Sequence, residues 1–148
     1  MNVSGLIISK KLAIGLWLCL ALFVLRVLAQ FLVYWVEVPF LPPFNFWYSG
    51  AISYSALLGW QFLIILLMVL FAVRFTKGLV IPHRGLGIWL QSIGILYFSV
   101  MFIRLVISLL GISELIWFNR PIPSFFHLIL ASYLIIAGRY HLDIKVKK

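Results

Sequence analysis

Two arginines and one histidine are the residues of this sequence best suited to bind an anion, and all three lie inside apolar stretches. Arg26 stands in "FVLRVLAQ" and Arg104 in "MFIRLVIS", and each is followed four residues later by a polar residue, Gln30 and Ser108. His127 stands in "PSFFHLIL". A guanidinium group presents five donors in a fork that matches carboxylate and phosphate oxygens. The pattern predicts a ligand- or partner-binding set of these five residues.

The two arginines have no acidic residue at their own depth. An arginine at the centre of a membrane helix costs about 2.5–3.5 kcal/mol on insertion scales. Glu37 follows Arg26 by 11 residues and Glu114 follows Arg104 by 10, which places each carboxylate about 15 Å away along a helix. We therefore expect both cations to meet backbone carbonyls, neutral polar groups, water, another subunit or a ligand. A purely structural role, fixing how the helices are aligned, is the alternative.

Helical spacing indicates which polar residues can share a face. At about 100° per residue, Gln30 lies on the face of Arg26, and Ser108 on that of Arg104. The stripe of His127 continues into apolar residues such as Leu134. If these faces converge, they form a cationic, partly hydrated pocket with apolar walls. Gln30, Ser108 and Gln61 are also suited to hydrogen bonds between helices.

The histidines raise the possibility of haem. His127 and His141 are 14 residues apart, and two histidines at this spacing on one membrane helix resemble the haem-bearing helices of b-type cytochromes. In those proteins histidines of a facing helix complete the pairs of axial ligands. His83 is the only other histidine and can meet only His141, so His127 has no histidine partner. We expect no cofactor, and the single cysteine, Cys19, excludes a multi-cysteine metal site.

The elements that must position these residues are membrane helices. The 148 residues are 65% hydrophobic and only 10% charged, whereas soluble domains carry roughly 25% charged residues. Four stretches reach the roughly 20 apolar residues that a membrane span needs, at about 12–36, 53–73, 86–110 and 121–138. They fill most of the chain. We therefore predict an all-α, four-transmembrane-helix bundle that forms one membrane domain over residues 1–148.

The connections between these stretches differ in character. "VPFLPPFNFWYSG" is rich in proline and aromatic residues, which favours either an aromatic belt at the membrane surface or a re-entrant, partner-docking loop. Ala51, Ser55 and Gly59 lie at four-residue spacing at the start of the second stretch. Small residues at that spacing let helices approach closely in lipid, so we expect the second helix to pack through them.

The basic residues predict the orientation in the membrane. The formal net charge is +9, but the cations are not spread as in a nucleic-acid-binding protein. Nine Lys and Arg flank the chain ends and the second connection, and only Arg120 lies in the other two connections. The positive-inside rule then places both termini in the cytoplasm, with the protein in the cell (inner) membrane. We expect no nucleic-acid partner.

The sequence leaves several functions open. It contains no intramembrane carboxylate, no phosphate-binding glycine loop and no zinc-binding helix, so we expect no enzymatic activity. The first hypothesis is an accessory or assembly subunit of a larger membrane complex, with a membrane protein partner or further copies of itself. The alternative is a binding module for a polar-headed or anionic amphiphile, such as a phospholipid, a polyprenyl phosphate or a quinone. A small oligomeric transporter is the third.

Overall fold

The computed structural model describes residues 3–36, 38–48, 50, 52–111 and 120–143, and every regular element in this part of the chain is helical. In chain order, the helices are α1 (Val3–Trp35), α2 (Phe44–Trp47), α3 (Tyr54–Thr76), α4 (Arg84–Leu110) and α5 (Pro121–Asp143). Four of them, all but α2, are long and apolar enough to cross a membrane. This confirms the four apolar spans and is consistent with a multi-pass membrane protein.

The helices extend beyond the apolar stretches that the sequence marks. α3 continues to Thr76 and α5 to Asp143, because a helix that leaves the hydrocarbon keeps its backbone hydrogen bonds in the polar surface region. The proline-rich connection also contains the short helix α2, which the sequence did not predict. Trp47 of α2 is buried, and its indole Nε1 donates to the Pro42 carbonyl at 2.8 Å.

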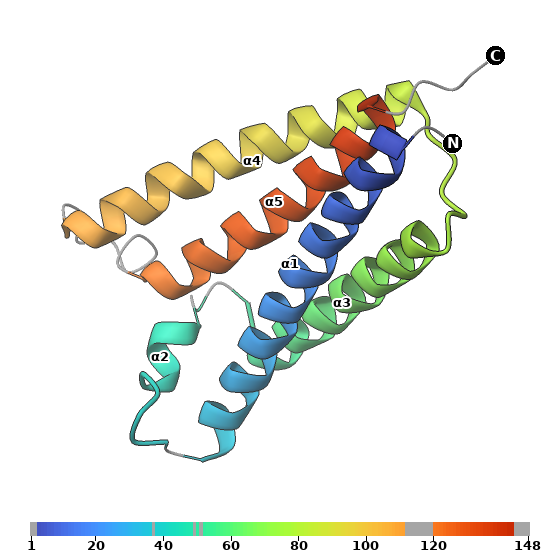
Figure 1. Ribbon diagram of the computed structural model, residues 1–148. Coiled ribbons are helices and arrows are strands. Elements are labelled where there is room, and N and C mark those ends of the chain that lie inside the picture. Colours follow the sequence, from blue (N-terminus) through green and yellow to red (C-terminus); the bar gives the residue numbers. More distant parts are fainter. Residues whose placement is uncertain (1–2, 37, 49, 51, 112–119, 144–148) are drawn as a thin grey trace.

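The four long helices form an open row in the order α4, α5, α1, α3 (Figure 1). Within the described part of the chain, α4 packs on α5 alone, and α3 packs on α1. Within the described part of the chain α3 and α4 do not pack on each other, so the four-helix bundle does not close into a ring. The start of α1 and the end of α5 lie together at one end of the long helices, which we call the terminal end. The opposite end of the helices, where α2 lies, is the α2 end.

The buried stripe of α1 explains why Arg26 points into the protein. The core residues Leu16, Leu20, Phe23 and Val27 recur every three or four positions, which is the repeat of one helix face. Arg26 and its neighbour one turn on, Gln30, fall on this same stripe and are buried with it. The helical repeat therefore carries a cation into the interior of an otherwise apolar helix.

Glycines allow α4 and α5 to approach each other closely. A Cβ atom added at Gly138 would lie 2.7 Å from the backbone nitrogen of Gln91, and one at Gly94 would lie 2.8 Å from Cγ1 of Ile135. Close packing through small residues is therefore found on α4 and α5. Gly59, where we expected such packing, is exposed and has nothing within 4 Å of an added Cβ. That expectation was wrong for Gly59 within the described residues.

The connection between α3 and α4 is held against α5. The hydroxyl of Tyr140 donates to the carbonyl of Val80 at 2.7 Å, and the backbone N–H of His83 donates to Nδ1 of His141 at 3.1 Å. The His83 ring in turn accepts from the backbone N–H of Leu86 and so caps the start of α4. These bonds position α4 relative to α5 at the terminal end.

Candidate functional site

Arg26 is the most unusual side chain of the described structure, because it is a buried cation with few partners. It is 7% exposed. Its Nη2 donates to the carbonyl of Trp47 at 3.4 Å, which is long for a hydrogen bond from a charged group. Its Cζ atom lies 5.5 Å from the centre of the Phe126 ring. Its Nε is buried without a hydrogen-bond partner among the described residues, so the guanidinium group keeps donor capacity to spare.

Two glutamines form a polar bridge beside Arg26. Nε2 of Gln61 in α3 donates to Oε1 of Gln30 in α1 at 3.0 Å. This is the kind of interhelical bond expected from the sequence. Gln30 is completely buried, and Gln61 is 3% exposed. Nε2 of Gln30 and Oε1 of Gln61 have no partner within the described part of the chain, so the bridge still has one donor and one acceptor available.

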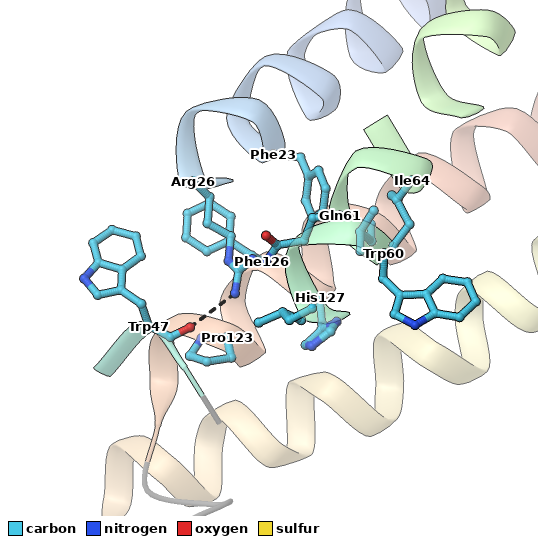
Figure 2. Close-up of a pocket in the computed structure, with 11 residues that line it drawn as sticks. Phe23, Arg26, Trp47, Trp60, Gln61, Ile64, Pro123, Phe126 and His127 are labelled. Carbon is cyan, nitrogen blue, oxygen red and sulfur yellow. Dashed lines mark hydrogen bonds between the residues drawn. The ribbon is translucent and has the colours of Figure 1, made fainter. Parts of the chain in front are cut away.

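A small cavity of about 90 Å³ brings these groups together, and we call it the polar cavity. Figure 2 shows Arg26, Gln61 and His127 around this space, supplied by α1, α3 and α5. The polar cavity is lined by these three residues together with Trp47, Pro123 and Phe126, among others. It therefore collects side chains from three of the four long helices and from α2.

His127 is held in place by a second residue. The hydroxyl of Tyr97 in α4 is hydrogen-bonded to Nδ1 of His127, which leaves Nε2 as the ring nitrogen that can meet a ligand. Both Arg26 and Arg104 are close enough to interact electrostatically with the histidine. The positive potential of two arginines therefore reaches the polar cavity, although only Arg26 lines it.

An apolar groove of about 410 Å³ adjoins the polar cavity. Ile64 and Leu130 line both spaces, so the two lie next to each other. The groove runs over α5 between α3 and α4, and its walls include Met68, Phe71, Tyr97, Tyr133 and Ala137. The groove exists because α3 and α4 stay apart in the open row of helices.

The structure brings some of the five predicted site residues together and leaves others aside. Arg26 and His127 line the polar cavity, and Gln30 lies behind it, bonded to Gln61. Arg104 is buried on α4 with Nη1 4.0 Å from Sδ of Met101, and it is not among the lining residues. Ser108 is half-buried and also lies outside the cavity lining.

Sequence reasoning missed two contributors to the cavity. Gln61 is not among the five predicted site residues, although a polar residue at that depth of an apolar helix is itself a signal. Trp47 contributes its backbone carbonyl. Because every residue has a backbone carbonyl, the residue type at position 47 does not predict this contact. It depends on how the connection folds back over α1 and α5.

The structure tests the remaining predictions about charge and haem only in part. Glu37 and Glu114, the acids expected to lie beyond reach of the arginines, are outside the described residues. The weak haem candidates His83 and His141 do meet, through the backbone nitrogen of His83, and His127 contacts neither by hydrogen bond. Among the described residues, no group of three or more His, Cys, Asp or Glu is placed to hold a metal ion.

Comparison with known proteins adds no further constraint on this site. No protein-family model, no curated protein and no solved structure matches the chain.

Proposed function

We propose that this protein is a non-catalytic integral membrane protein that binds an amphiphile with an anionic or polar head. The head lies in the polar cavity beside Arg26, Gln61 and His127, and the hydrocarbon tail lies in the adjoining apolar groove. One observation carries the proposal. The buried Arg26, whose Nε has no partner among the described residues, lines a polar space that adjoins an apolar groove.

The energetics of Arg26 support an anionic head. The helix bears an insertion cost of about 2.5–3.5 kcal/mol for this cation, and the described protein contacts compensate it with one long hydrogen bond and one ring contact. A ligand anion would supply short, charge-assisted hydrogen bonds in a low-dielectric site. Arg26 is thus better explained as part of a binding site than as a structural residue.

The groove supports a hydrocarbon tail. Small-molecule sites are mostly apolar, have volumes of about 300–1,000 Å³, and carry a few polar groups that orient the ligand. The groove of about 410 Å³ has this size, and its walls are almost entirely apolar. Because it opens between two helices rather than at a helix end, a lipid can enter it sideways from the bilayer.

The proposed orientation places the polar cavity near the outer leaflet of the cell (inner) membrane. Arg74, Lys77 and Arg84 lie at the terminal end of the helices. The connection around α2 contains no lysine or arginine. By the positive-inside rule the terminal end is cytoplasmic. The cavity lies toward the other end, where Trp47 of α2 meets Arg26.

The test is the amphiphile that co-purifies with the protein. Wild-type protein extracted in a mild detergent should retain a bound lipid detectable by native mass spectrometry. Arg26→Gln should reduce the bound fraction at least tenfold, and Gln61→Leu should reduce it less. Gln91→Leu is the matched control, because Gln91 is a polar residue of α4 outside the cavity lining and its Oε1 has no partner in the described structure.

Two outcomes would contradict the proposal. In the first, wild-type protein retains no amphiphile. In the second, Arg26→Gln retains as much amphiphile as wild type and as the control Gln91→Leu. Size-exclusion profiles of all variants must match that of wild type, so that loss of ligand is not mistaken for loss of fold.

An accessory subunit remains a second candidate, because the open row of helices also suits a partner. A transmembrane helix of another protein, or of a second copy, could lie between α3 and α4 on the exposed side of α5. Solubilisation in a mild detergent followed by affinity purification should then yield a stoichiometric membrane partner. A monodisperse protein that retains only lipid would contradict this role and support the first.

A further inference from the structure

We infer that the amphiphile is a lipid that ends in a phosphate monoester; this rests on the proposed function and specifies its ligand. The size of the polar cavity is the first observation. Whole small-molecule sites measure about 300–1,000 Å³, whereas this cavity measures only about 90 Å³. A phosphate group is of that size. A phosphate that also bears glycerol, choline or a sugar, or the ring of a quinone, needs considerably more room.

The groups beside Arg26 at the α2 end of the cavity are the second observation. α2 packs against both α1 and α5, and Figure 2 shows the Trp47 carbonyl and Pro123 together beside the Arg26 guanidinium. A second substituent on the phosphate would have to pass these groups. The single ester oxygen of a monoester can instead point along Ile64 and Leu130 into the groove. The shape therefore favours one substituent over two.

The donors around the cavity are the third observation. Nε of Arg26 has no partner in the described structure, and His127 uses Nδ1 for Tyr97, so that its Nε2 is the ring nitrogen left for a ligand. If both glutamine amides turn over, their mutual hydrogen bond is kept and the Gln61 amide offers an N–H group in place of its unpartnered oxygen. A phosphate monoester has three acceptor oxygens and a charge of about −1.5 to −2. Three donor groups and the potential of two arginines match it better than they match a carboxylate or a phosphodiester.

The experiment compares defined lipids that differ by one feature. Delipidated, detergent-solubilised full-length protein is titrated with geranylgeranyl monophosphate, phosphatidic acid, phosphatidylglycerol and geranylgeraniol, and binding is read by native mass spectrometry. Both monoesters should bind at least tenfold more tightly than phosphatidylglycerol and geranylgeraniol. Arg26→Gln should remove this preference, and Arg26→Lys should keep part of it because the charge is retained.

The outcomes separate this inference from the proposed function. If phosphatidylglycerol binds as tightly as phosphatidic acid and both depend on Arg26, the monoester inference is overturned and the proposed function stands. If no lipid binds, or if binding is the same in Arg26→Gln, both fail. If Arg26→Gln does not fold, the preference for monoesters is compared between Gln61→Leu, which changes the cavity, and its control Gln91→Leu. A preference for either monoester over the other supports the inference and identifies the tail as isoprenoid or diacyl.

Discussion

At the scale of single residues, the structure contrasts a hydrogen-bonded pair of amides with a buried cation that has few partners. Gln30 and Gln61 compensate much of each other's burial through one hydrogen bond. Arg26, close by on the same buried stripe of α1, makes a long bond to a carbonyl and a contact with the Phe126 ring. A buried polar group without adequate partners destabilises a fold. The proposed ligand rests on this shortage of partners at Arg26.

Arg26→Met tests whether the arginine serves binding at the expense of stability. Removing a poorly compensated buried charge and keeping the volume is expected to stabilise the ligand-free protein by about 1–3 kcal/mol. Thermal unfolding of delipidated protein in detergent measures this as a higher Tm. The same substitution should abolish lipid retention. A clear fall in Tm would instead show that Arg26 fixes how the helices are aligned.

The Gln30–Gln61 bond can be measured by a double-mutant cycle. Gln30→Leu and Gln61→Leu should each lower stability, and the double variant should lose less than the sum because each single variant leaves one amide unpaired. Interhelical hydrogen bonds in membranes give coupling energies of about 0.6 kcal/mol, with a maximum near 1.7. Equilibrium unfolding in mixed micelles provides the four free energies. Strict additivity would mean that the bond does not form in the folded protein.

At the scale of elements, α5 holds the row together. It contacts α4 through glycines and α1 through core residues, and its Tyr133 hydroxyl donates to the Met68 carbonyl of α3 at 2.7 Å. α4, by contrast, depends on α5 alone for helix packing in the described structure. The width of the groove is thus set by how firmly α4 is seated on α5.

Gly138 and Gly59 form a matched pair for testing this packing. Gly138→Ala should destabilise the protein by about 1–3 kcal/mol, because its new Cβ would meet the Gln91 backbone at 2.7 Å. Gly59→Ala should be neutral or stabilising by up to about 1 kcal/mol, since its Cβ meets nothing within 4 Å and alanine is the better helix former. Thermal unfolding of both variants in one detergent decides. Equal effects would contradict the close α4–α5 contact.

At the scale of the whole molecule, the site depends on the fold being open. A four-helix ring would fill the space between α3 and α4 with side chains, whereas the open row leaves the groove beside the polar cavity. The terminal end and the α2 end also differ in charge, because exposed lysines and arginines such as Arg74, Lys77 and Arg84 gather at the terminal end. This asymmetry supports one orientation in the membrane.

Single-cysteine labelling tests that orientation. In a Cys19→Ala background, Asn45→Cys in α2 should react with a membrane-impermeant maleimide added to intact cells, and Lys77→Cys between α3 and α4 should react only after the membrane is opened. Both positions are exposed in the structure. Labelling of both from the outside, or of Lys77→Cys alone, would overturn the proposed orientation.

The sequence by itself determined the number and approximate limits of the four apolar helices, because a run of roughly 20 predominantly apolar residues is a local property that needs no knowledge of neighbours. It also predicted that Arg26 and Gln30 share a face of one helix, since that follows from the helical repeat alone. Even the interhelical role of Gln61 could be inferred from a polar amide in an apolar helix.

Only the tertiary structure decided which faces meet. All four helices are apolar almost all round, so hydrophobicity, which selects the buried face in water, gives little direction between helices in lipid. Close backbone approach at Gly87, Gly94 and Gly138 selected α5 as the partner of α4, and this separated α4 from α3. That choice left Arg104 and Ser108 outside the polar cavity and opened the groove beside it. The packing of α3 and α2 on α1 brought Gln61 and the Trp47 carbonyl to Arg26. Contacts of this kind depend on distances between helices, which spacing along a single chain does not encode.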